Sequence, residues 1–258
     1  MSAKTMGFVG GGRITRIMLG GFQRAGKTPG RVVVTDPIAD GLTALKTEFP
    51  GIDIYHNQNA QAAAQDIVFV AVHPPAMAAV LGEIQSSLKA KSVLISLAPR
   101  VAIAKIGEML GFERIVRMIP NAPSIVNKGY NPVSFSPALT GKEKDELLGL
   151  FRTLGECPEV PEEHLEAYAI ITAMGPTYLW FQLHELQEIA QSFGLTRRDA
   201  ETGIAKMVKG AVKTMYRSGL TPEKVMDLIP VRPLGEEEAN IRNLYRSKLG
   251  GLFKKLKG

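Results

Sequence analysis

Short apolar runs alternate with segments of helical spacing along the first half of the chain. Met6–Gly10 and Val32–Thr35 are apolar or β-branched, and the residues 14–24 and 41–49 that follow them carry apolar positions three and four apart. This alternation predicts an α/β fold, in which a doubly wound parallel sheet has helices on both faces. Further strands are expected at Ile67–Val72, Val93–Leu97, Ile115–Ile119 and Pro132–Phe135.

The pattern changes near residue 160, where strand-like runs give way to long helical periodicity. We therefore expect two domains, residues 1–160 and an all-α second domain of residues 161–258. Gly194 is typical of a helix stop and Thr196 of an N-cap. Helices are expected over residues 165–174, 178–193, 200–218 and 222–229, and from residue 237 onward.

The helices of the second domain carry wide apolar faces. A domain of this size cannot bury all of them alone, so a homodimer through the C-terminal helices is expected. Trp180 and Phe181 are expected in the core of the domain.

Charge, cysteine content and hydropathy exclude several classes of function. The net charge of +6 comes from a basic C-terminal tail, which is typical of a solvated helix face, so no nucleic-acid partner is expected. Cys157 is the only cysteine and the four histidines are scattered, so no metal site is expected. The apolar run Ile67–Val72 has six residues, far below the ~20 that cross a bilayer. With no export signal at the N-terminus, a cytoplasmic protein is expected.

Gly10, Gly12 and Thr15 form a GxGxxT turn between the first strand and the first helix. In a Rossmann-type domain the first glycine permits the tight turn and the second lets a pyrophosphate approach the helix N-terminus. The third position is threonine here, which is compatible with a slightly wider separation of helix and strand. A glycine turn can also be only a turn, but its place after the first strand favours a dinucleotide site.

Thr35 and Asp36 end the second strand, where an acid can accept a hydrogen bond from the adenosine ribose. No lysine or arginine lies between Pro37 and Leu45 to bind a 2′-phosphate, so NAD is favoured over NADP. The alternative is a polar strand exit, with the cation supplied from elsewhere, Arg13 included.

Five motifs follow one another along nearly the whole chain, at Gly7–Gly12, Val70–Pro74, Arg117–Pro123, Thr172–Tyr178 and Gly194–Ala200. In this order they resemble the GFIGxG, LAVKP, RxMPNTP, SGSGPAY and GLxxxDA segments of the pyrroline-5-carboxylate reductase family.

The resemblance implies a homodimeric NAD(P)H-dependent oxidoreductase that reduces the C=N bond of a small cyclic imine, as in proline biosynthesis. Carried over by motif, the residues at the pyrophosphate are Gly10, Gly12, Arg13 and Ile14. Those lining the rest of the cofactor are Val72, His73, Pro74, Asn121 and Pro123, although residues 120–123 can equally form a rigid turn.

Substrate contacts are expected in the segment Thr172–Tyr178. Thr172 is the candidate for a hydroxyl near the reacting nitrogen, and the alternative is a helix-capping hydroxyl. Met174, Gly175 and Tyr178 are further candidates, although polar faces such as that of Tyr178 are often dimer contacts or solvated surface.

The chain departs from the family where substrate should bind. Val231–Glu236 stands in place of SPGGTT and lacks its donors, and Arg100 stands at a normally small position of SIAAGI. Arg232 can grip a differently placed anion, or can be a surface arginine before Pro233. We therefore expect poor reduction of pyrroline-5-carboxylate itself.

Two other functions remain open from the sequence. A non-catalytic NAD(P)-binding regulator is consistent with the altered 231–236 segment, and a deazaflavin-dependent NADP oxidoreductase shares the opening fold. The β-hydroxyacid dehydrogenases share the two-domain plan but use a helix lysine, and the absence of a lysine between Gly175 and Gly194 counts against their mechanism.

Overall fold

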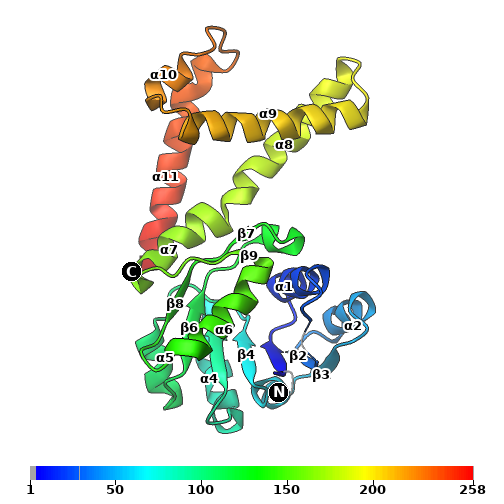
Figure 1. The fold of residues 1–258 in the computed structure, drawn as a ribbon, viewed down its shortest axis with the longest axis vertical. Helices are drawn as coiled ribbons and strands as arrows, with labels where there is room; N and C mark the ends of the chain where they lie inside the picture. Colours follow the sequence, from blue (N-terminus) through cyan, green and yellow to red (C-terminus); the bar gives the residue numbers. More distant parts are fainter. Residues whose placement is uncertain (1–3, 29, 258) are drawn as a thin grey trace. The chain divides into compact units, whose positions relative to one another are not determined.

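Seven strands form the main sheet, with helices on both of its faces (Figure 1). The computed structural model describes residues 4–28 and 30–257. The strands are β1 (Met6–Val9), β2 (Val32–Asp36), β3 (Asp53–His56), β4 (Ile67–Val70), β5 (Val93–Ser96), β6 (Ile115–Met118) and β8 (Val133–Phe135). They lie in the order β3-β2-β1-β4-β5-β6-β8, and every neighbouring pair is parallel except β6 and β8. The doubly wound α/β sheet predicted from the apolar pattern is confirmed.

The two faces of the sheet bury separate apolar clusters. Successive residues of β1 point to opposite faces, so Phe8 and Val9 belong to different clusters. Phe8 stacks on Phe69 of β4, with ring centroids 4.7 Å apart, beneath the first group of helices. On the Phe8 side the covering helices are α1 (Arg13–Arg24), α2 (Ala39–Glu48) and α6 (Gly141–Phe151); on the Val9 side they are α3 (Asn59–Ala63), α4 (Met77–Ile84) and α5 (Ile103–Leu110).

The apolar pattern does not predict β3 or α6. β3 is an edge strand whose residues are half-buried or exposed, so it carries polar residues such as Asp53 and His56 in place of an apolar run. In α6 the buried residues are Leu147, Leu148 and Phe151, in an otherwise largely charged segment. A second, two-stranded sheet pairs β7 (Gly129–Tyr130) with β9 (Gly155–Glu156).

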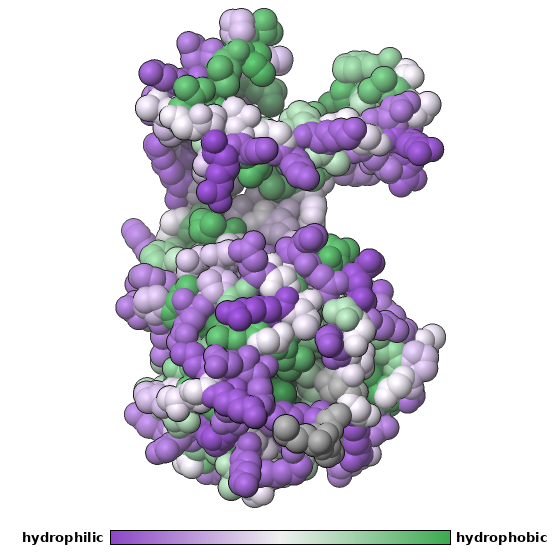
Figure 2. All heavy atoms as spheres, in the orientation of Figure 1, coloured by the Kyte–Doolittle hydropathy of each residue, from purple (hydrophilic) through white to green (hydrophobic). Residues whose placement is uncertain are grey.

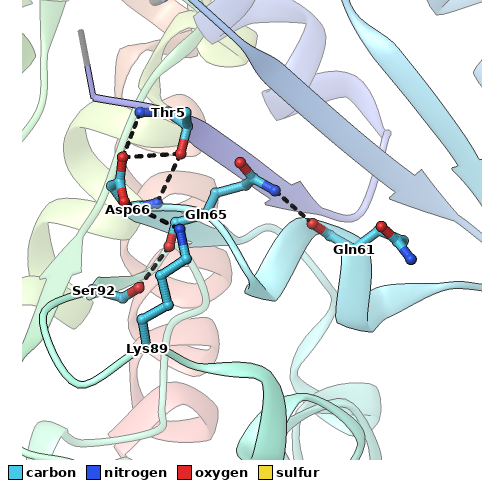
Figure 3. Close-up of polar contacts among 6 residues, drawn as sticks. All are labelled: Thr5, Gln61, Gln65, Asp66, Lys89 and Ser92. Carbon is cyan, nitrogen blue, oxygen red and sulfur yellow. Dashed lines mark hydrogen bonds and ion pairs between the residues drawn. The ribbon is translucent and has the colours of Figure 1, made fainter. Parts of the chain in front are cut away.

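A polar network ties together the beginnings of β1, β4 and β5 (Figure 3). The Asp66 Oδ2 atom accepts from the backbone N–H of Thr5 at 2.8 Å and from its hydroxyl at 3.0 Å. Lys89 Nζ lies 3.3 Å from Asp66 Oδ1, and the Ser92 hydroxyl donates to the Gln65 carbonyl at 2.6 Å. The polar groups of this network bond to one another, so we assign it a structural role.

The second unit consists of helices. Residues up to Met174 form the first unit, which also includes Phe253 and the described residues after it, and Gly175–Leu252 form the second. The boundary expected near residue 160 therefore lies inside the first unit. The first unit contains α7 (Leu165–Tyr168) and a π turn over Ala169–Ala173; the later helices are α8 (Gly175–Ser192), α9 (Arg197–Arg217), α10 (Pro222–Met226) and α11 (Glu238–Lys257).

The helix boundary around Gly194 agrees with the prediction. Gly194 has a φ of +94°, which glycine adopts without a steric penalty, and Thr196 caps α9 by accepting from the Asp199 N–H at 3.2 Å.

The prediction that Trp180 and Phe181 lie in a core is wrong for this chain. Trp180 is 51% exposed and Phe181 67% exposed, so neither lies in a core of this chain. Open hydrophobic surface of the helical unit is visible in Figure 2.

Replacing Asp66 by asparagine should lower the free energy of unfolding by about 1 kcal/mol at pH 7, because its bonds lose their charge. The Thr5 N–H is the main reason that the pKa of Asp66 lies below its ordinary value. A depressed folded-state pKa stabilises the protein above the unfolded-state pKa, near 3.9, and this contribution is lost as the pH falls through the folded-state pKa. Urea unfolding at pH 7 and pH 3 should therefore show a smaller deficit at pH 3 than at pH 7. An equal deficit at both values would contradict the charge argument, and Asp145→Asn on exposed α6 is the matched control.

Candidate functional site

Four loops meet at the carboxyl edge of the sheet. They follow β1, β4, β5 and β6 and consist of residues 10–13, 71–74, 97–102 and 119–121. β1 pairs with β2 on one side and β4 on the other, which makes it the point where the strand order reverses. Nucleotides bind such sheets in the crevice at this switch point. The fold therefore gathers most of the cofactor residues expected from the sequence at one edge.

The glycine turn is fixed by a close approach of two backbones. Gly10 has a φ of +106°, and a Cβ built there would lie 2.6 Å from the Ala71 carbonyl oxygen. Its N–H donates to the Thr35 carbonyl at 2.8 Å. The buried Thr15 hydroxyl donates to the Gly10 carbonyl at 2.6 Å. Threonine at the third position of the motif therefore holds the turn closed, a role that spacing alone does not reveal.

The N-terminus of α1 presents open donors. Gly12 is the exposed N-cap, and among the described residues no side chain caps the helix there. A Cβ on Gly12 would meet nothing within 4 Å. The first helical hydrogen bond runs from the Arg16 N–H to the Gly12 carbonyl at 3.1 Å, which leaves the N–H groups of Arg13, Ile14 and Thr15 without a helical acceptor. These donors and the helix dipole suit a diphosphate.

Asp36 connects the glycine turn to α2. Its Oδ2 atom accepts from the Gly11 N–H at 2.7 Å and its Oδ1 atom from the Ile38 N–H at 2.8 Å. Ile38 is 65% exposed beside this carboxylate and offers an apolar surface for a base, which the sequence reading missed. Thr35 is fully buried and its hydroxyl donates to Asn59 at 2.5 Å, so its side chain does not face a ligand.

The loops after β4 and β6 differ in what they expose. His73 is exposed, whereas Val72 and Pro74 are half-buried, and all three lie directly beyond β4. Asn121 is buried, donates to the Thr172 carbonyl at 3.2 Å and accepts from the Tyr130 N–H at 3.1 Å. The Asn121 side chain therefore holds the π turn in position. The adjacent Pro123 is half-buried in a 3-10 turn over Ala122–Val126.

Thr172 lies in the π turn, a local geometry that often marks functional sites. Its hydroxyl donates to the Tyr168 carbonyl at 2.8 Å. Because the hydroxyl proton is used in this bond, the hydroxyl oxygen remains available as a hydrogen-bond acceptor. Met174 follows the turn as the last residue of this part of the first unit, and it is half-buried.

The remaining expected substrate residues belong to the second unit. Gly175 begins α8, and the Tyr178 ring meets the Tyr245 ring at 6.0 Å, nearly perpendicular. Burial raises the pKa of Tyr178. Arg232 Nη2 donates to the Met226 carbonyl at 2.8 Å, so this guanidinium caps the end of α10.

A buried ion cluster anchors α7 to β6. Arg117 is 3% exposed, and its guanidinium donates to Glu162 at 2.9 Å and to Glu166 at 2.6 Å. Burial acts to raise the pKa of Glu166, but the hydrogen bond and charge of Arg117 outweigh it and lower this pKa. Glu166 also accepts from the backbone N–H of Arg100 at 3.1 Å. The RxMPNTP-like motif includes Arg117, but the sequence does not indicate which carboxylates it meets.

The described residues support neither a cysteine nucleophile nor a metal site. Cys157 is buried, and desolvation raises the pKa of its thiol to about 12, so it is not a nucleophile. Over residues 4–28 and 30–257, no three His, Cys, Asp or Glu side chains form a group that could hold a metal ion. None of the helices in the described part of the chain is long and apolar enough to span a membrane.

Two family models match the chain. One, described as NADP oxidoreductase coenzyme F420-dependent, matches residues 5–100, and one for pyrroline-5-carboxylate reductase dimerisation matches residues 162–256. The pyrroline-5-carboxylate reductase of Escherichia coli (strain K12) is 31% identical over 228 residues, which cover 88% of this chain and 84% of that protein. The enzyme of Corynebacterium melassecola is 28% identical and covers 96% of this chain and 93% of its own.

Solved structures agree with this assignment. The pyrroline-5-carboxylate reductase of Coxiella burnetii superposes with a TM-score of 0.73 at 27% identity and covers 100% of both chains. The Plasmodium falciparum pyrroline carboxylate reductase with NADP bound has a TM-score of 0.79 at 22% identity, covers 99% of this chain and 96% of its own, and supports the fold. The chain belongs to the pyrroline-5-carboxylate reductase family of NAD(P)-dependent oxidoreductases.

Proposed function

We propose that this protein reduces the C=N bond of a small cyclic imino acid with a hydride from NADH or NADPH. The observation that carries the proposal is the uncapped, sterically open N-terminus of α1 at the switch point of the sheet. Family membership supplies the reaction class. The full-length relatives are pyrroline-5-carboxylate reductases, which favours this reaction over a deazaflavin-dependent one or a purely regulatory role.

Each part of the dinucleotide has a matching surface in the first unit. The N–H groups of Arg13 and Ile14 would bind the diphosphate, Asp36 the adenosine ribose and Ile38 one face of the adenine. The loop after β4, with His73 at its exposed point, would line the nicotinamide. When bound, the nicotinamide supplies the hydride.

The reaction adds a hydride to the imine carbon, while the protonated nitrogen keeps its proton and becomes an amine. An iminium is already electrophilic, so the protein has mainly to orient it. The iminium N–H needs an acceptor, and the Thr172 hydroxyl oxygen is one, because its own proton is donated to the Tyr168 carbonyl. We assign Thr172 this orienting role.

The working form is a homodimer built by the C-terminal helices. The dimerisation model covers residues 162–256, and this region leaves Trp180 and Phe181 open to solvent. Exposed apolar area of this kind marks an interface. The strand-and-helix unit in contrast buries most of its large apolar residues, and the exposed ones among its described residues are Ile38, Ile125, Val126 and Ile171.

Gly12→Val should weaken NADH binding at least 100-fold, because the side chain fills the space beside the α1 donors. It should cost less than about 1 kcal/mol of unfolding free energy, since nothing opposes its Cβ. Gly10→Ala is the matched contrast, because its φ of +106° and the Ala71 carbonyl should make it destabilising by about 2 kcal/mol. Calorimetric titration and urea unfolding separate the two effects. Unchanged NADH affinity in Gly12→Val would remove the glycine turn from the site.

NADH should bind more tightly than NADPH, because the Asp36 carboxylate repels a 2′-phosphate. Asp36→Asn removes the charge and keeps an acceptor for the Gly11 N–H. The ratio of the NADPH to the NADH dissociation constant should fall about tenfold, or roughly 1.4 kcal/mol. Asp40→Asn, an exposed acid in the first turn of α2, is the control. A wild-type preference for NADPH would overturn this assignment.

The purified protein should reduce pyrroline-5-carboxylate poorly compared with its E. coli relative and should prefer another cyclic imino acid. Segment 231–236 lacks the family's donors, and losing two charge-assisted hydrogen bonds costs on the order of 100-fold in kcat/KM. NAD(P)H oxidation with pyrroline-5-carboxylate and the piperideine carboxylates tests this. Turnover of pyrroline-5-carboxylate equal to that of the relative would refute the altered specificity, and silence toward every imine would refute the proposed reaction.

Light scattering should give a mass twice the 28.0 kDa of the chain at micromolar concentration. Phe181→Glu places a charge on the exposed apolar surface and should shift the protein to monomer. Lys91→Glu, on the surface of the strand-and-helix unit, should remain a dimer. A monomeric wild-type protein would contradict the dimer proposal.

A further inference from the structure

We propose that Arg100 binds the substrate carboxylate and so takes over the role of the donors missing from segment 231–236. The inference rests on the proposed imino-acid reduction and assigns its specificity-determining residue. It explains how the chain can keep its reaction class after losing the family's carboxylate-binding loop.

The backbone of Arg100 is held in a conformation that favours glycine. Its φ is +80°, a region that a long side chain occupies only at an energetic cost. The Arg100 N–H donates to Glu166, which Arg117 fixes in turn. The resembling family motif has a small residue at this position, which suits such a φ without strain. Glycine would adopt this φ without strain, so an arginine at this position points to a role for its side chain.

Arg100 lines a cavity that holds three basic and three acidic residues. The cavity has a volume of about 340 Å³, and its charged lining residues are Arg100, Arg117, Lys257, Glu162, Glu163 and Glu166. Arg117 is paired with both Glu162 and Glu166. The other charged lining residues are Arg100, Lys257 and Glu163. Lys257 Nζ lies 5.3 Å from the centre of the Phe253 ring. Among residues 4–28 and 30–257 no hydrogen bond or ion pair engages the Arg100 guanidinium, so it is open to an anion.

The place of Arg100 on the sheet suits this role. It follows β5, the strand next to β4, and adjacent strands lie about 4.8 Å apart. The loop that carries Arg100 therefore lies at the same carboxyl edge as the proposed nicotinamide site around Val72–Pro74. The proposal places the carboxylate of the imino acid at Arg100 and its C=N carbon at the nicotinamide. Arg232, the other candidate, already donates to the Met226 carbonyl.

Arg100→Gly is the decisive variant, because it removes the guanidinium and relieves the backbone strain of the positive φ. The variant should unfold at the same or a higher temperature than wild type. Its KM for the best imino acid should rise about 10- to 100-fold, the loss expected for one bidentate charge-assisted contact. Its KM for NADH should stay within twofold. Arg100→Lys, which keeps the charge, should recover part of the affinity. Lys105→Ala, at an exposed position of α5, should behave as wild type.

A binding experiment decides the question even if no imine tested is reduced. Titrations of the NAD-loaded protein with L-proline and L-pipecolate, and with pyrrolidine and piperidine as counterparts without the carboxylate, isolate the carboxylate contact. Wild type should prefer the amino acids, and Arg100→Gly should lose that preference. An Arg100→Gly protein with unchanged affinity for the amino acids, or with impaired NADH binding alone, would overturn the role of Arg100. Intact turnover of imino acids by that variant would leave the proposed reaction standing without it.

Discussion

The site depends on the close approach of two backbones at the ends of β1 and β4. The glycine turn and the loop after β4 lie so close together at the switch point that a Cβ on Gly10 would clash with the Ala71 carbonyl. The positive φ of Gly10 and this close approach both require glycine. Thr15 and Asp36 then hold the turn from either side through its carbonyl and its next N–H. These hydrogen bonds do not use the N–H groups in the first turn of α1, so those donors remain available to a ligand. The cofactor surface is thus a consequence of how the turn is closed.

A second constraint acts at the end of β6. Burying Arg117 is tolerable because Glu162 and Glu166 satisfy its charge, and the same carboxylates accept the N–H groups of Ile103 and Arg100. One ion cluster therefore sets α7, the start of α5 and the loop that carries Arg100. Removing Arg117 alone would leave the buried Glu166 carboxylate without its ionic partner. The cluster links the architecture of the first unit to the proposed specificity residue.

The sequence predicts most strands of the sheet and the glycine turn, for physical reasons that differ between elements. Central strands such as β4 are buried on both faces, so they are continuous apolar runs, whereas the edge strand β3 is half-solvated and shows no such run. The glycine turn was found because its backbone geometry restricts residue type. The bonds of Thr15 and Asn121 could not be predicted, because a side-chain bond to a backbone atom leaves no periodic trace in the sequence. Apolar spacing predicts Trp180 and Phe181 in a core, because the spacing does not say which molecule buries them.

The most direct test of the account is the fate of the hydride. The protein would be supplied with NADH deuterated at the nicotinamide C4 position that is transferred, together with its best cyclic imino acid, and the product would be examined by mass spectrometry and NMR. Hydride transfer at the proposed site predicts one deuterium, located at the carbon of the former C=N bond. A product without deuterium, or no reduced product from either C4-deuterated form of NADH or NADPH, would contradict it.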